Sequence, residues 1–191
     1  MQRRRVKWVD DLEPSSYLVI KQVGDGNCLF RALAWCVDNT AQRHARVRRE
    51  VCGYISSRAA RDALFAAYIM ARAAPSDIGA YVNSMSQDKA HGGAIEIAAW
   101  ALTHKACVRS YSPVHVGNRR VYQLVTSIDH REVEYEIQRV RLPNGKRSRR
   151  EHAIKPDCSS PPAGGIVLLL WSWFGSLGVG HYDLLQRCAL A

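Results

Sequence analysis

The chain has 191 residues, of which 47% are hydrophobic and 23% charged, and its formal net charge is +10. This length and apolar content suit one folded domain and exclude a chain too polar to collapse. The positive charge raises the question of a nucleic-acid partner, but no recognised binding motif accompanies it, and we expect none. Much of the excess lies in two short clusters, interpreted as a solvated tail and a loop tip: Arg3, Arg4, Arg5 and Lys7, and Lys146, Arg147, Arg149 and Arg150.

The cysteines and histidines argue against a metal centre or a disulfide framework. The six cysteines include no Cys-x-x-Cys pair, and the histidines show no metal-ligand spacing with them. We therefore expect no metal, no cofactor and a reducing, cytoplasmic compartment. The uncharged stretch 164–180 is interrupted by glycines and serines and is too short for a membrane span, so we expect no membrane association.

The first half of the sequence is predicted to be mostly helical. Residues 17–23 favour a strand that runs into a Gly-Asp-Gly-Asn loop. From Cys28 the apolar period becomes helical and stops near Asn39. Helical spacing returns in four later segments, 47–55, 61–73, 78–85 and 94–104. In the first of these, the face opposite the apolar stripe is predicted to carry Arg46, Arg48, Arg49 and Glu50.

Strand patterns dominate after residue 104. They cover residues 106–111, 121–125, 133–140, 166–173 and 181–185. One long loop is expected at residues 144–162. The sequence thus predicts helices followed by a sheet, which the strand at 17–23 could join.

Cys28 begins the first predicted helix and follows a loop with two glycines. The thiolate is the nucleophilic form of cysteine, and the partial positive charge at a helix N-terminus lowers the pKa of a thiol. Backbone N–H groups of such a loop could also receive the oxyanion of a tetrahedral intermediate. Because buried cysteines at helix starts are common and inert, this pattern alone does not establish a nucleophile.

A base for such a nucleophile is found near the other end of the chain. In the predicted strand 181–185, His181 and Asp183 lie two residues apart and therefore point to the same face. The Asp183 carboxylate can then orient the imidazole and stabilise its protonated form. Taken as an isolated pair, a surface histidine and a solvated aspartate are the simpler interpretation.

Three motifs together resemble the ovarian-tumour (OTU) family of cysteine proteases. Residues 25–32, Asp-Gly-Asn-Cys-Leu-Phe-Arg-Ala, match the family's nucleophile motif residue for residue. Residues 85–98 resemble its central Gly-Gly segment, and residues 180–183 its histidine motif. The resemblance implies an α/β (α+β) fold of the papain-like kind, with a helical first half and a central, mostly antiparallel sheet. It also implies that residues 17–188 are a single OTU-like catalytic domain, preceded by a basic tail at 1–16.

The resemblance implies roles for individual residues. Cys28 would be the nucleophile, His181 the general base and acid, and Asp183 the orienting acid. Asp25 matches an aspartate that the family counts with its active site. The backbone groups of Asp25, Gly26 and Cys28 would form the oxyanion hole.

Residues near this site are expected to hold the tail of the substrate. The family cuts bonds after the C-terminal glycines of ubiquitin, and a narrow channel lined by glycine suits a tail without side chains. The candidates are Gly92, Gly93, Trp173 and Gly180. His91 departs from the tryptophan that often precedes Gly-Gly in the family, a change that concerns packing or substrate contact and not the catalytic set.

The resemblance predicts a monomeric deubiquitinating enzyme that hydrolyses isopeptide bonds to ubiquitin or ubiquitin-like modifiers. One alternative is a cysteine protease of the same fold that processes a polyprotein, for example a viral one. Another is a catalytically silent module that binds ubiquitin or nucleic acid. The intact Cys28, His181 and Asp183 argue against the silent module.

Overall fold

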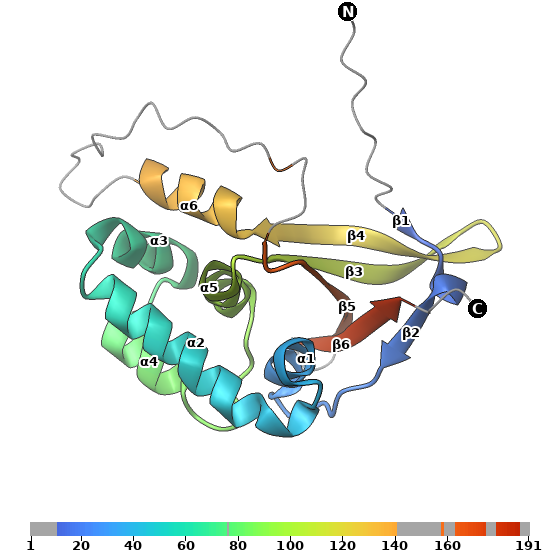
Figure 1. The fold of residues 1–191 in the computed structure, drawn as a ribbon, viewed down its shortest axis with the longest axis horizontal. Helices are drawn as coiled ribbons and strands as arrows, with labels where there is room; N and C mark the ends of the chain where they lie inside the picture. Colours follow the sequence, from blue (N-terminus) through green and yellow to red (C-terminus); the bar gives the residue numbers. More distant parts are fainter. Residues whose placement is uncertain (1–10, 76, 141–157, 159–162, 175–178, 188–191) are drawn as a thin grey trace, which may run out of the picture.

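A six-stranded sheet forms the centre of the computed structural model, which describes residues 11–75, 77–140, 158, 163–174 and 179–187 (Figure 1). The strands follow the order β1-β4-β3-β5-β6-β2. Among the pairings of these described strands, only β3 with β5 is parallel, which confirms the predicted mostly antiparallel sheet. The strands are β1 (Asp11–Leu12), β2 (Tyr17–Ile20), β3 (Cys107–Val116), β4 (Arg119–Asp129), β5 (Ile166–Phe174) and β6 (Val179–Arg187).

The pairing of β2 with β6 brings together two segments that lie far apart in the sequence. Tyr17 lies opposite Arg187, and Ile20 lies opposite Leu184. The chain leaving β2 therefore runs past residues 181–183 before it enters α1. This register places the loop before Cys28, residues 24–27, beside the predicted histidine motif, residues 180–183. Residues 24–27 are called the nucleophile loop.

The helices gather to one side of the sheet, and the β3–β4 hairpin extends away from them (Figure 1). All five helices predicted in the first half are confirmed. The helices of the structure are α1 (Cys28–Asp38), α2 (His44–Ala59), α3 (Ala63–Ala73), α4 (Ile78–Met85), α5 (Ala94–His104) and α6 (His130–Arg139). The main core joins α1, α2, α3, α5 and α6 to β3, β5 and β6. Cys28 is the first residue of α1, and the two residues after it, Leu29 and Phe30, are completely buried in this core.

The strand predicted at 133–140 is wrong, because this segment lies almost entirely in α6. Val133 and Ile137 are buried in the core, and their four-residue spacing fits an α-helix as well as an alternating strand. The helix is favoured over the strand by its N-cap residue, Asp129, whose side chain accepts a hydrogen bond from the backbone N–H of Arg131 at 2.9 Å.

Residues 11–16, which the sequence assigned to the basic tail, contact the sheet. Asp11 and Leu12 pair with β4, and a 3-10 turn at Pro14–Ser16 leads into β2. Leu12 packs against an apolar cluster that includes Tyr111 and Tyr122. The sheet and its apolar cluster therefore include residues before Tyr17, among them the partly buried Leu12.

Some expectations fall on residues outside the described ranges: both basic clusters, the loop at 144–162 apart from Cys158, and residues 175–178. The cysteines that the structure describes, residues 28, 36, 52, 107 and 158, are free thiols. No described helix is long and apolar enough to cross a membrane. In the same ranges, no group of three or more histidine, cysteine, aspartate or glutamate side chains could hold a metal ion.

Candidate active site

Cys28 lies at the N-terminus of α1, against the strand that carries the histidine motif. Its side chain is only 3% exposed. Burial raises the pKa of this thiol, and the nearby backbone N–H groups of Tyr182 on β6 and of Leu29 on α1 act in the opposite direction. Tyr182 lies between His181 and Asp183 on β6, and this strand packs against α1, which Cys28 begins.

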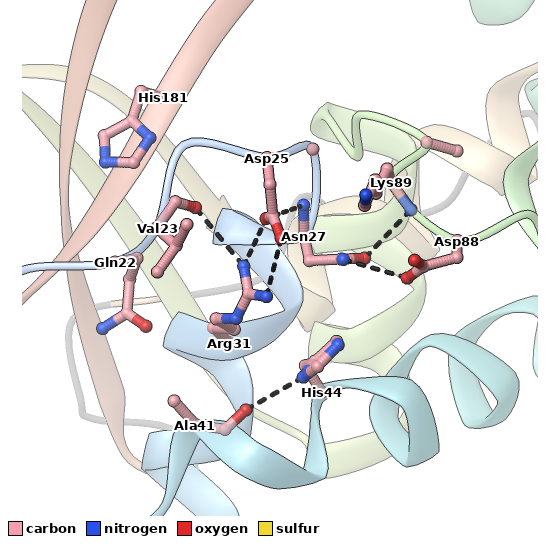
Figure 2. Close-up of polar contacts among 12 residues, drawn as sticks. Gln22, Val23, Asp25, Asn27, Arg31, Ala41, His44, Asp88, Lys89 and His181 are labelled. Carbon is pink, nitrogen blue, oxygen red and sulfur yellow. Dashed lines mark hydrogen bonds and ion pairs between the residues drawn. The ribbon is translucent and has the colours of Figure 1, made fainter.

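His181 and Asp183 contact each other, as their two-residue spacing predicted. His181 Nε2 lies 2.9 Å from Asp183 Oδ1, and both residues are buried. The other ring nitrogen, Nδ1, is on the side of the nucleophile loop, since a Cβ added to Gly24 would lie 3.7 Å from it. Figure 2 shows His181 beside the loop that carries Asp25.

Asp183 is anchored by the segment that follows β2. The backbone N–H of Gln22 donates to Oδ1 at 2.8 Å, and Lys21 Nζ donates to Oδ2 at 2.8 Å. Burial raises the pKa of this carboxyl, but the hydrogen bonds from Lys21, Gln22 and His181 outweigh burial and leave the pKa below its ordinary value. Asp183 is therefore a carboxylate at neutral pH and can accept a hydrogen bond from the N–H of His181 Nε2. That tautomer leaves Nδ1 as the basic nitrogen facing the loop.

The thiol pKa differs from the sequence prediction. Burial raises the pKa of Cys28 above its ordinary value, even though backbone N–H groups act in the opposite direction. The helix N-terminus therefore does not by itself produce a thiolate, because desolvation of the sulfur is the larger effect. Formation of a thiolate would therefore require a neighbouring base, and Nδ1 of His181 lies on the side of Gly24, in the segment that leads to Cys28.

Asp25 points away from His181 and shapes the loop. Its carboxylate forms a two-pronged ion pair with Arg31 and accepts the N–H of Asn27 at 3.1 Å (Figure 2). Its Arg31 partner also donates to the carbonyl of Val23 at 3.3 Å. The hydrogen bonds from Arg31 hold the pKa of Asp25 far below its usual range. Because the backbone N–H of Asn27 already donates to the Asp25 carboxylate, that N–H is not free to bind an oxyanion.

The ionised state of Asp25 predicts a contribution to acid stability. A carboxyl with a lowered folded pKa stabilises the fold above its unfolded pKa, near 3.8, and this stability is lost as the pH falls toward the folded value. Between pH 5 and pH 2, the denaturation midpoint of the native chain should therefore fall more steeply than that of Asp25→Asn. Urea titrations at several pH values measure both slopes. Equal slopes would show that the Arg31 contact does not stabilise the loop.

Gly26 has a structural requirement for glycine. Its φ is +86°, and a Cβ here would lie 1.8 Å from the carbonyl oxygen of Lys89. The nucleophile loop therefore packs directly on the backbone of the segment between α4 and α5.

The residues predicted to hold the substrate tail have packing roles in the structure, and their substrate contacts stay a prediction. A Cβ on Gly92 would lie 2.8 Å from Leu29 and 3.0 Å from Phe30. Gly93 caps α5, and its N–H donates to Glu96 at 2.7 Å. Gly180 leaves room for the indole of Trp171, and Trp173 pairs with Gly180 between β5 and β6, its side chain lying outside what the structure describes.

Two glycine substitutions should change stability in opposite directions. Gly92→Ala places a methyl group against fully buried Leu29 and Phe30, and we expect a loss of about 1–3 kcal/mol of unfolding free energy. Gly53→Ala, at an open position inside α2, should add about 0.5–1 kcal/mol. Chemical denaturation measures both, and a neutral Gly92→Ala would show that the base of the nucleophile helix can repack.

A family model described as "OTU-like cysteine protease" matches residues 23–148 of this chain. The chain belongs to the OTU-like cysteine protease family. The match includes Cys28, whereas His181 and Asp183 lie beyond it and are placed by the geometry described above. Membership in the OTU family confirms the resemblance that the three sequence motifs indicated.

Relatives of known sequence or structure agree with this assignment. The Arabidopsis thaliana "OVARIAN TUMOR DOMAIN-containing deubiquitinating enzyme 10" is 34% identical over 90 residues, which cover 47% of this chain and only 23% of that enzyme. The OTU domain of OTUD1 matches with a TM-score of 0.56 and 18% identity, over 91% of this chain and 87% of that chain. The Hazara virus OTU, solved bound to ubiquitin, matches with a TM-score of 0.56 and 19% identity, over 94% and 87%. These structures show that the fold is that of OTU domains.

Sequence reasoning missed three residues that support the site. Lys21 and Gln22 bind Asp183 across 161 or more positions of sequence, so only the β2–β6 pairing brings them together. Arg48 was assigned to the solvent face of its helix, but it is 4% exposed. A signal for its burial was present, because Arg48 lies three, four and seven residues before the buried Val51, Cys52 and Ile55.

Proposed function

We propose that this OTU protein is a deubiquitinating enzyme that hydrolyses isopeptide bonds after the C-terminal glycines of ubiquitin. The observation that carries the proposal is the approach of β6 to the start of α1. β6 packs against α1, which Cys28 begins, and β6 also carries the hydrogen-bonded His181–Asp183 pair. Ubiquitin as partner is supported by the family and by the ubiquitin complex of the Hazara virus OTU.

In the proposed reaction, His181 takes the thiol proton of Cys28 and the thiolate attacks the carbonyl carbon of the scissile bond. Backbone N–H groups of the loop and the first turn of α1, among those of Asp25, Gly26 and Cys28, receive the oxyanion. The C–N bond then breaks, and protonated His181 gives its proton to the leaving lysine amine. Water, activated by His181, hydrolyses the thioester and releases ubiquitin. Asp183 keeps the imidazole in the required tautomer throughout.

The remaining features of the proposal follow from the sequence. The catalytic unit is a single domain that acts as a monomer in the cytoplasm, without a metal or cofactor. Gly92, Gly93, Trp173 and Gly180 are proposed to lie along the path of the ubiquitin tail.

The proposal is tested by incubating the native chain with a panel of linked di-ubiquitins and with ubiquitin carrying a C-terminal electrophile. We expect release of mono-ubiquitin and a single covalent adduct, which peptide mass mapping should place on Cys28. The other described cysteines serve as internal controls for non-specific alkylation. A folded chain that neither cuts conjugates nor forms the adduct would contradict the proposal, and cleavage confined to a peptide junction would favour a polyprotein protease.

A further inference from the structure

Arg48 is a buried cation that the proposed reaction does not use. Its guanidinium donates to the carbonyl of Met85 at 2.8 Å and to that of Ala90 at 2.8 Å. It also donates to Asn27 Oδ1 at 2.6 Å and to the carbonyl of Gly26 at 3.4 Å. Arg48 on α2 therefore binds the loop before Cys28 and the segment between α4 and α5 at the same time.

The same two segments also contact each other directly through Asn27. Asn27 Nδ2 donates to Asp88 at 3.0 Å, and the N–H of Lys89 donates back to Asn27 Oδ1 at 3.3 Å (Figure 2). Gly26 packs on the Lys89 carbonyl, as described above. Arg48 is thus one member of a connected network in which Asn27 is the shared residue.

Arg48 further contacts the nucleophile helix. Its guanidinium carbon lies 4.0 Å from the centroid of the Phe30 ring, two residues after Cys28. A planar group that stacks on a ring and donates to four acceptors cannot be replaced by the single ammonium of lysine. The site therefore requires the shape of arginine and not only its charge.

We propose that Arg48 is a positioning residue that fixes the Gly26–Asn27 peptide and the start of α1, and so sets where the backbone N–H groups meet the oxyanion. Its guanidinium touches neither the thiol nor, in the proposed reaction, the substrate. This inference rests on the proposed function for its catalytic consequence. The connection between the two loop segments is a property of the fold and can be measured separately.

The test compares Arg48→Lys with Arg58→Lys on the same helix. Arg58 is a suitable control because it also bonds several partners, Tyr54, Asp62 and Glu134, and lies near the Phe65 ring. We expect Arg48→Lys to lower kcat for cleavage of a ubiquitin C-terminal fluorogenic amide by about 10- to 100-fold, because small displacements of aligned groups have effects of this size. KM should change less than about twofold, and Arg58→Lys should retain native kinetics below its melting temperature.

Two further measurements distinguish positioning from general destabilisation. Hydrogen exchange should accelerate in residues 24–29 and 86–91 of Arg48→Lys but not of Arg58→Lys. Alkylation of Cys28 by chloroacetamide, which forms no oxyanion, should proceed within about twofold of the native rate in both variants.

Unchanged exchange in residues 24–29 and 86–91 of Arg48→Lys would overturn the proposed connection, whether or not the protein is active. Equal loss of kcat in both arginine variants, or a native kcat in Arg48→Lys, would overturn the positioning role. If the native chain itself does not cleave the amide, the proposed function fails, and the exchange comparison still decides the connection.

Discussion

Replacing Cys28 with alanine should lower the rate of ubiquitin release by at least about 10³-fold, because loss of the nucleophile leaves only binding and oxyanion stabilisation. The assay is single-turnover cleavage of a fluorogenic ubiquitin amide, followed at protein concentrations above KM. Binding of ubiquitin should persist, since the thiol contributes one small buried group.

Cys36→Ala provides the matched control on the same helix. Its thiol donates to the carbonyl of Ala32, one turn earlier in α1, at 3.3 Å. Native activity in Cys36→Ala and loss in Cys28→Ala would assign the reaction to Cys28. Substantial residual cleavage by Cys28→Ala that is abolished by replacing another cysteine would contradict the assignment.

Removing the Asp183 side chain with Asp183→Ala should lower kcat by about 10³-fold, because the imidazole loses the group that fixes its tautomer. The substitution also leaves the buried N–H of Gln22 without its acceptor, which should cost about 1–3 kcal/mol of stability. Activity must therefore be measured well below the melting temperature of the variant.

Asp183→Asn should restore most of this activity. Its amide oxygen can take the place of Oδ1 and accept both the Gln22 N–H and His181 Nε2. The amide nitrogen then faces Lys21, whose side chain is 76% exposed and can turn to solvent. We expect kcat within about tenfold of native, and an asparagine variant as inactive as the alanine variant would show that the charge of Asp183, and not its orienting hydrogen bond, is what His181 requires.

Asp129→Ala separates the catalytic effect from the effect of deleting a buried carboxylate. Asp129 is also buried and has a lowered pKa, but its partners are Arg131 and the start of α6. This variant should lose stability while keeping the native kcat. Loss of kcat comparable to that of Asp183→Ala would contradict a specific role for Asp183.

Local periodicity was sufficient to predict the helices of the first half, because each has an apolar face and an end signal within a few residues. The strand wrongly predicted at 133–140 marks the limit of this reasoning. Val133 and Ile137 satisfy both periods, and the Asp129 cap that selects the helix acts from outside the alternating segment. Periodicity is least able to distinguish a helix from a strand where the apolar residues are few and evenly spaced.

The proposed catalytic residues could be picked out because their motifs are local, whereas the residues that support them are distant in sequence. The pairing of His181 with Asp183 needs only the two-residue repeat of a strand. The anchoring of Asp183 by Lys21 and Gln22 depends on β2 joining the far edge of the sheet, and no local pattern specifies that neighbour. The raised pKa of Cys28 likewise depends on packing by β6, which the position of a cysteine at a helix start does not reveal.

The joining of β2 to β6 has a consequence for how the enzyme is made. Gln22 and Asp183 are 161 residues apart in the chain, so the site closes only when nearly the whole domain is available. On the ribosome, Cys28 emerges long before His181, and an unfinished chain carries the nucleophile without its base. Strand pairings of such long sequence separation are also intrinsically slow to form. In the proposed enzyme, proteolytic activity should therefore appear only after the whole domain has been translated.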